Sequence, residues 1–515
     1  MFILIRIHNS ASTKFIQNIK FSNPDAFVLL EKISFFSHKE IPYELLQYLY
    51  EDKHRLDAAI SELQELDVLR KTSTIACFEV PEIFQHIVLN CLSSRKKLAL
   101  LKEISKLLNN SSLTKLELFH LDKFDQLLPH LKIFLAHINR AKLNTNDVLD
   151  LKLSTFDYIR TIQRNYHVAL EFMVSNLPEA QLKQKKHHPD TAQLYLAGAG
   201  IYQWFGETQK SIQIVENIVK ITSNTLTNNK TLNIFHRACY FLAIAYLDQG
   251  NLTKAKKYIE MSYQHKNKML PKNSMRLYDA EARLAFDIGD INMAHKFLSS
   301  ETQEIESIYE KNNIQNFKHF AELQVFLLKY KILTLLQPYD FLPELLKVYD
   351  ECKSQNNYKH HRSVAFLKIL IGKQLIKNNK LSDAQTLISE GIHSLEHEYK
   401  YGAPRRDLAY AYMSLGDLYY EKQDHIQAKQ AYEQSRALYE KTLVTSQAIY
   451  EVALLAKKML NTYIKLKDEF AAKSQLVKFK LIFGVDHTIY KQLNKTLSSF
   501  IPSANDDSII HTSTN

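Results

Sequence analysis

The fold is decided by the stretch Leu242-Ala243-x-x-Tyr246-x-x-x-Gly250-x4-Ala255-x3-Ile259. A helix that carries small residues is expected to end at Gly250, and a second helix centred on Ala255 follows. Small side chains allow two helices to cross closely, and Tyr246 fills the groove that remains between them. The stretch therefore predicts a helical hairpin.

The same frame returns along the chain. Leu415-Gly416-x-x-Tyr419-x-x-x-Gln423-x4-Ala428-x3-Tyr432 and Ile371-Gly372-x-x-Leu375-x-x-x-Asn379-x4-Ala384-x3-Ile388 keep its spacing, and looser copies span 197–215 and 463–476. The frame positions 206, 250, 289, 379, 423 and 467 are 44, 39, 90, 44 and 44 residues apart. The interval of 90 residues leaves room for one degenerate hairpin at 317–354. Repetition of this kind predicts stacked helical hairpins.

These hairpins resemble a long form of the tetratricopeptide repeat. The entry segment His188-Pro189-Asp190-Thr191-Ala192 is similar to a lead-in that is common in that subfamily, where proline ends one helix and aspartate caps the next. The resemblance covers about 186–480 and implies an all-α superhelix whose neighbouring hairpins share one core.

Composition agrees with an all-α fold. The 515 residues include only 10 glycines and 11 prolines, too few for the turns of a sandwich, a barrel or a doubly wound sheet. No phosphate-binding loop of the form G-x-x-x-x-G-K-[ST] occurs. The four cysteines lack the spacing of a zinc site or a disulfide framework, and no segment is long and apolar enough for a membrane span, so we expect a cytoplasmic protein.

The first hundred residues follow another pattern. Two helices are separated by a polar turn, with Pro42 at the start of the second, and a third helix and a two-stranded wing at 68–80 follow. This order resembles the winged helix that follows the NB-ARC ATPase in STAND signalling proteins. Pro81 replaces the histidine usual in that family, whereas Gln85 matches the glutamine after it. The few residues upstream leave no room for an ATPase domain, which we expect to be absent.

The chain is thus expected to contain five segments. They are a leader (1–12), a winged-helix-like domain (13–95), a helical connector with degenerate hairpins (96–185), tetratricopeptide-like repeats (186–480), and a terminal helix with a disordered tail (481–515).

No catalytic site emerges from the sequence. His393-Ser394-Leu395-Glu396-His397 matches the inverted zinc-protease motif H-x-x-E-H, but it falls at the end of a repeat helix, where solvated surface is the simpler interpretation. The adjacent pairs His187-His188 and His360-His361 diverge on a helix and cannot chelate alone. We expect no enzymatic activity, no metal and no cofactor.

Net charge bears on the partner. The chain carries +11, whereas residues 1–130 contain 16 basic and 16 acidic residues, so the winged helix lacks the excess of basic residues that DNA binding normally requires. The positive excess lies on the repeats, whose first helices line the concave side in this family. Counting back from the frame positions gives the candidate partner-binding residues Arg237, Tyr240, Arg276, Arg283, Lys373, Tyr410, Asp417, Lys457 and Asn461.

The sequence therefore favours a non-catalytic scaffold or adaptor that binds a partner protein, an acidic peptide or helical segment, in the concave groove. Two alternatives stay open. The chain could be the sensor half of a split or truncated STAND regulator, or, as a minor alternative, a DNA-binding regulator that uses its winged helix. The sequence indicates no membrane partner and does not decide the oligomeric state.

Overall fold

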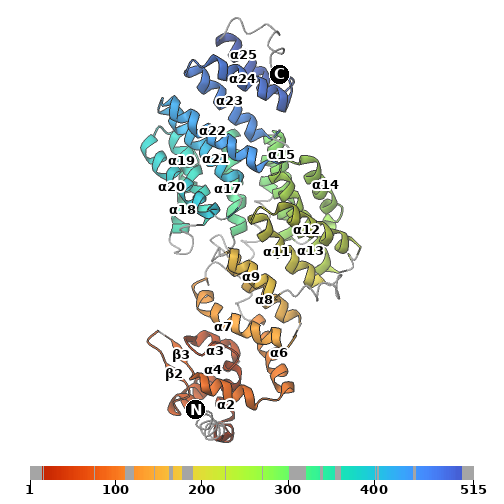
Figure 1. Ribbon diagram of the computed structural model, residues 1–515, viewed down its shortest axis with the longest axis vertical. Coiled ribbons are helices and arrows are strands. Elements are labelled where there is room, and N and C mark those ends of the chain that lie inside the picture. The colour runs from red at the N-terminus through yellow and green to blue at the C-terminus, as the bar shows by residue number, and fades with distance from the viewer. Residues whose placement is uncertain are drawn as a thin grey trace, which may run out of the picture. The chain divides into compact units, whose positions relative to one another are not determined.

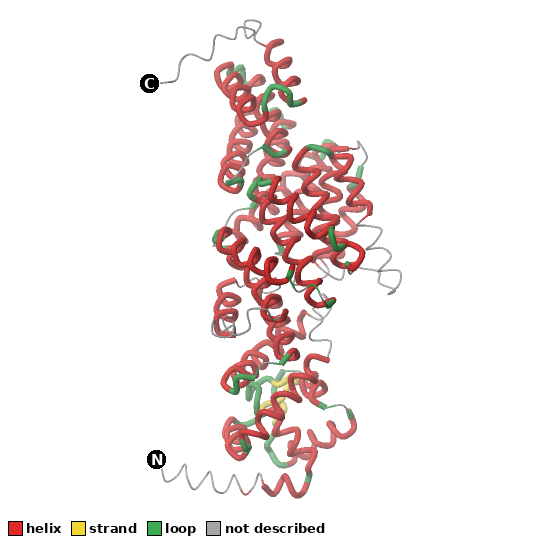
Figure 2. Tube along the Cα trace, turned by 90° about the vertical axis from the view of Figure 1, so that its right-hand side faces the viewer, coloured by secondary structure: helices red, strands yellow, loops and turns green. Residues whose placement is uncertain are grey.

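The chain forms two compact units, Met1–Ile201 and Tyr202–Asn515, in the computed structural model (Figure 1). The structure describes residues 14, 17–50, 52–74, 76–110, 121–143, 145–161, 166–176, 189–224, 226, 228–269, 271–300, 320–336, 340–353, 361–400, 402, 405–444 and 448–500. Most described residues are helical, and the described strands all belong to the first unit (Figure 2). The fold class is all-α, as the sequence predicted.

The first unit begins with helices around a small sheet. Its first elements are α2 (Pro24–Ile33), β1 (Ile41–Pro42), α3 (Tyr43–Leu49), α4 (Lys53–Glu65), β2 (Arg70–Lys71) and β3 (Cys77–Glu79). Side chains cap two of these helices, because Asn23 accepts a hydrogen bond from the Ala26 amide and Asp52 accepts from the amides of the first turn of α4.

The sheet is antiparallel with the order β1-β3-β2. Ile41 pairs with Phe78, and Arg70 pairs with Glu79. The sequence predicted the β2–β3 wing but missed β1, because a strand of two residues that contains a proline shows no alternating pattern.

The rest of the first unit is helical. It contains α5 (Glu82–Cys91), α6 (Ser94–Asn110), α7 (Leu121–Arg140), α8 (Asn146–Thr161) and α9 (Tyr166–Asn176), and the boundary with the second unit falls within α11 (Pro189–Trp204). Gln85 on α5 is buried and donates a hydrogen bond to the Ile33 carbonyl at 3.1 Å. His187 and His188 lie outside the described residues.

The second unit is a succession of helical hairpins. After α11 come α12 (Thr208–Ser223), α13 (Asn229–Asp248), α14 (Leu252–Tyr263), the short helix η3 (Lys266–Lys268), α15 (Pro271–Ile288), a helix at 291–300, α17 (Phe320–Leu336), α18 (Leu342–Lys353), α19 (Arg362–Lys377), α20 (Leu381–Tyr399), α21 (Arg406–Glu421), α22 (His425–Thr442), α23 (Tyr450–Lys465), α24 (Glu469–Phe483) and α25 (Thr488–Phe500). Helices α17 and α18 occupy the interval assigned to a degenerate hairpin. The predicted tail beyond 500 lies outside the described residues.

The predicted frame positions all adopt the left-handed backbone conformation. Positive φ angles of 57° to 87° occur at residues 206, 250, 289, 379, 423 and 467. At each of them the amide of the next residue bonds to the carbonyl five residues earlier, as from Asn251 to Tyr246 at 2.8 Å and from Asp424 to Tyr419 at 2.9 Å. This is the hydrogen-bond pattern of a Schellman cap, which ends the first helix and turns the chain into the second.

Small residues of the second helices then allow close packing. Ser211, Ala255, Ala294, Ala384, Ala428 and Ala472 each follow a frame position by five residues and are fully buried. Since the amide of each bonds to the carbonyl four residues back, every second helix starts at the same point of the frame. The repeat frame read from the sequence is therefore the physical repeat of the fold.

Gly416 supplies a testable packing contact. A Cβ atom at this position would lie 2.3 Å from the ring of Tyr432, which is buried and whose hydroxyl donates to Asp417 at 2.8 Å. We expect Gly416→Ala to lower the free energy of unfolding by about 1–3 kcal/mol, because overpacking outweighs the gain in helix propensity. Chemical denaturation measures the loss. In a Tyr432→Leu background the same substitution should be neutral or stabilising, and an equal loss in both backgrounds would contradict the contact.

Candidate partner-binding groove

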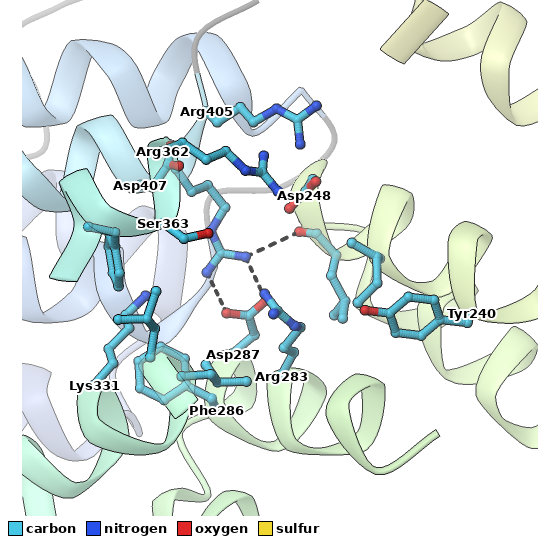
Figure 3. Close-up of a pocket in the computed structure, with 16 residues that line it drawn as sticks. Tyr240, Asp248, Arg283, Phe286, Asp287, Lys331, Arg362, Ser363, Arg405 and Asp407 are labelled. Carbon is cyan, nitrogen blue, oxygen red and sulfur yellow. Dashed lines mark hydrogen bonds and ion pairs between the residues drawn. The ribbon is translucent and has the colours of Figure 1, made fainter. Parts of the chain in front are cut away.

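The first candidate site of the second unit lies between the first helices of successive hairpins. A pocket of about 200 Å³ opens there, and each of its lining residues belongs to α13, α15, α17, α19 or α21 or to the cap of α21 (Figure 3). Its lining is Tyr240, Ile244, Leu247, Asp248, Arg283, Phe286, Asp287, Leu327, Leu328, Lys331, Arg362, Ser363, Phe366, Arg405, Arg406 and Asp407.

A buried ion cluster centred on Arg406 forms one wall. The Arg406 guanidinium donates to both carboxylate oxygens of Asp287, at 2.6 and 2.8 Å, and to Glu451 at 2.7 and 3.2 Å. Lys331 forms an ion pair with the same Glu451. The four charges come from α15, α17, α21 and α23, so the cluster ties together helices that are up to 164 residues apart in sequence.

The two carboxylates of the cluster have different environments. Burial is the largest influence on Asp287 and raises its pKa, although Arg406 opposes that shift. Burial would also raise the pKa of Glu451, but the two cations Lys331 and Arg406 lower it to about 2. The cluster is neutral when both carboxylates are ionised, as the burial of charges requires.

The cluster continues into aromatic contacts. The ammonium group of Lys331 lies 4.6 Å from the centre of the Tyr410 ring, and that of Lys373 lies 4.7 Å from the same ring. Tyr410 is only 4% exposed. Two lysines cover its ring in the structure, and contact of Tyr410 with a partner stays a prediction.

A second hollow of about 340 Å³ lies farther along the first helices. Asp417 is one of its lining residues and accepts a hydrogen bond from Lys458 at 2.6 Å, while the Lys373 ammonium group lies 3.5 Å away. Burial would raise the pKa of Asp417, but these two ammonium groups lower it below its usual value. Asn461 completes this side of the hollow.

The partner-binding residues predicted from the sequence do not all lie in one cavity. Tyr240 and Arg283 line the first pocket, but both bind Asp279, the tyrosine hydroxyl at 2.7 Å and the guanidinium at 2.9 Å. Arg276 lines a separate cavity of about 10 Å³ next to His236. Lys373, Asp417 and Asn461 lie at the second hollow, and Lys457 donates a hydrogen bond to Gln492. Arg237 lies on α13 and lines none of these three cavities.

The repeat frame did not point to the residues of the ion cluster, Asp287, Lys331, Arg406 and Glu451. A signal was present, since Lys331 interrupts the apolar run of α17 between Leu328 and Ile332. A charge on the buried face of a helix requires a partner of opposite charge. Lys331 therefore predicts an ion pair but does not identify the residues that form it.

The described residues offer no group of three or more His, Cys, Asp and Glu side chains that could hold a metal ion. His393 and His397 are exposed on α20, and Glu396 between them accepts a hydrogen bond from Tyr412 at 2.5 Å. His361 caps α19 through its Nδ1 atom, whereas His360 lies outside the described residues.

Within the described ranges, each helix is too short or too polar to cross a lipid bilayer.

Comparison with known proteins gives structural similarity alone. No protein-family model matches the sequence. No curated protein matches it either.

Several solved structures have a similar course of the chain. One is a signal transduction ATPase with numerous domains (STAND) that carries a tetratricopeptide repeat sensor, from Pyrococcus horikoshii, at 13% identity and a TM-score of 0.49 over 94% of this chain and 67% of that one. Another is a Rap protein in complex with competence and sporulation factor, at 11% identity and a TM-score of 0.40 over 79% and 99%. A third is IFIT1 with Gppp-AAAA, at 10% identity and 0.36 over 93% and 95%. The fold assignment rests on the helical hairpins of this chain itself.

Proposed function

We propose that the protein is a non-catalytic interaction scaffold whose groove binds a segment of a partner protein. This proposal rests on which helices line the first pocket and the second hollow. Apart from Tyr432 on α22 and Arg405 at the cap of α21, their lining residues belong to the first helices of successive hairpins. Stacked hairpins present such a continuous face as a binding surface.

The chemistry of the first pocket favours an acidic segment. Arg362 and Arg405 lie at the beginnings of α19 and α21 and line the pocket, and Arg405 has no carboxylate partner among the described residues. Phe286 and Phe366 line it together with Leu327 and Leu328. A segment with a carboxylate next to an apolar side chain could pair with Arg405 and contact the apolar part of the pocket.

The protein is proposed to act in the cytoplasm. Cys77, Cys91, Cys239 and Cys352 are all free thiols, which suits a reducing compartment.

Affinity capture from cell lysate tests the groove. The full chain is compared with Arg362→Glu/Arg405→Glu and with the control Lys380→Glu/Lys441→Glu, which makes the same charge change at exposed sites outside the groove. We expect a protein that the wild type and the control retain and the groove variant loses. Retention of the same proteins by all three chains would contradict the proposal.

A second candidate is the sensor half of a split or truncated STAND-type regulator. It is supported by the order of elements in the first unit, α2-β1-α3-α4-β2-β3, and by the pairing β1-β3-β2. In this case capture should depend on exposed residues of the first unit. Loss of the partner in Phe21→Glu/Ile83→Glu, with no loss in Arg362→Glu/Arg405→Glu, would favour the regulator over the groove scaffold.

A further inference from the structure

Helix α24 is apolar on two opposite faces. Its inner face buries Ala472, Leu476 and Phe479, and the helix packs on α23 and α25 (Figure 1). On the other side Phe470 is 86% exposed and Leu481 is 80% exposed. Large apolar side chains that are exposed together on one face of a helix indicate a contact surface.

Three exposed apolar residues and the half-buried Ser474 form a regular seam on this side. Phe470, Ser474, Val477 and Leu481 follow one another at intervals of four, three and four residues. This is the spacing of the d and a positions of a heptad repeat, which line one side of a helix and insert between the side chains of a facing helix. The seam from Phe470 to Leu481 is about 16 Å long, enough for roughly three turns of contact.

Lysines flank the seam on both sides. In the same heptad, Lys473 and Lys480 take the g positions and Lys478 takes the e position. Lys478 and Lys480 are exposed, and Lys473 is half-buried. Residues 451–500 as a whole contain nine lysines and four acidic residues. Residues at e and g select the partner helix by charge, so this seam favours glutamate or aspartate on the facing helix.

We propose that the outer face of α24 docks an acidic amphipathic helix of a partner protein. A second copy of this chain is a poor occupant, since pairing α24 with itself would bring lysine rows together. The seam lies on the second helix of its hairpin, whereas the groove is built from first helices. The surface is therefore separate from the proposed groove, and neither proposal depends on the other.

A designed peptide tests this docking directly. The probe is a fluorescently labelled three-heptad helix with leucine at a and d and glutamate at e and g, and a matched peptide carries lysine at e and g. Fluorescence anisotropy with the full chain should show binding of the glutamate peptide and at least tenfold weaker binding of the lysine peptide. Leu481→Glu should weaken binding of the glutamate peptide at least tenfold.

A charge exchange provides the control. Lys473→Glu/Lys478→Glu/Lys480→Glu should reverse the preference, so that the lysine peptide binds more tightly. Lys256→Glu/Lys380→Glu/Lys441→Glu makes the same change at exposed lysines of other hairpins and should leave the original preference. If both triple variants lost binding of the glutamate peptide to the same extent, the proposal would be overturned.

Two other outcomes would also overturn it. One is co-sedimentation of the full chain with phosphatidylserine vesicles that depends on Leu481, which would assign the seam to a lipid surface. The other is self-association in sedimentation velocity that Leu481→Glu abolishes, which would assign it to a second copy.

Discussion

Replacing Arg406 with methionine is expected to lower the free energy of unfolding of the second unit by about 3–5 kcal/mol. The substitution removes the bidentate partner of Asp287 and one of the two cations on Glu451. Both carboxylates are only 1–2% exposed, so water cannot replace the guanidinium. Asp287 would then take up a proton, because burial already raises its pKa.

Fluorescence of the single tryptophan provides the measurement. Trp204 is 5% exposed and packs near Gly402 within the second unit, so its emission during chemical denaturation follows that unit. Arg405→Met is the matched control, since this neighbouring arginine has no ion pair among the described residues, and it should change stability by no more than about 0.5 kcal/mol. If Arg406→Met and Arg405→Met lowered the free energy of unfolding equally, the ion cluster would not be what stabilises the fold.

Acidification from pH 6.5 to 4 is expected to lower the free energy of unfolding of the second unit by about 2.5 kcal/mol through His236 alone. This imidazole on α13 is 2% exposed, and its Nδ1 atom lies 2.8 Å from the Ser262 hydroxyl. Burial, with a smaller effect of His265, lowers its pKa to about 4. The unfolded chain therefore binds a proton in this range that the folded chain does not, and stability falls as the pH falls.

The variant His236→Phe should flatten this dependence. Its free energy of unfolding, followed by Trp204 fluorescence, should change less than that of the wild type between pH 6.5 and 4, whatever its absolute stability at neutral pH. Ser262→Ala removes the hydrogen bond but keeps the imidazole, so it should retain the wild-type slope. If the free energy of unfolding of His236→Phe depended on pH as that of the wild type does, His236 would be excluded as the source of this pH dependence.

Local signals determined what the sequence could predict of the fold. The frame positions were found because each helix cap and the small residue five positions later are fixed by contacts within one hairpin. Asn379, Gln423 and Lys467 take the left-handed conformation as glycine does at 206 and 250, so the spacing identified the turn even where the residue type did not.

The groove depended on contacts that no local pattern encodes. Arg406 meets Asp287 across 119 residues and Glu451 across 45, and only the stacking of the hairpins brings them together. For the same reason Tyr410 and Arg283, which the repeat frame placed toward a partner, are occupied by Lys331, Lys373 and Asp279. The frame placed these candidates on first helices but gave no signal for the side chains that contact them.

Site-specific photo-cross-linking tests the central claim, that the face of first helices holds a partner segment. A photoreactive phenylalanine analogue replaces Ile244 in the first pocket or Leu335 in the second hollow, and Ile426, which is 62% exposed on the second helix α22, serves as the control position. The account predicts that both groove positions cross-link the same protein in cells and that the Ile426 position does not. Cross-linking of that protein from Ile426 but from neither groove position would contradict it.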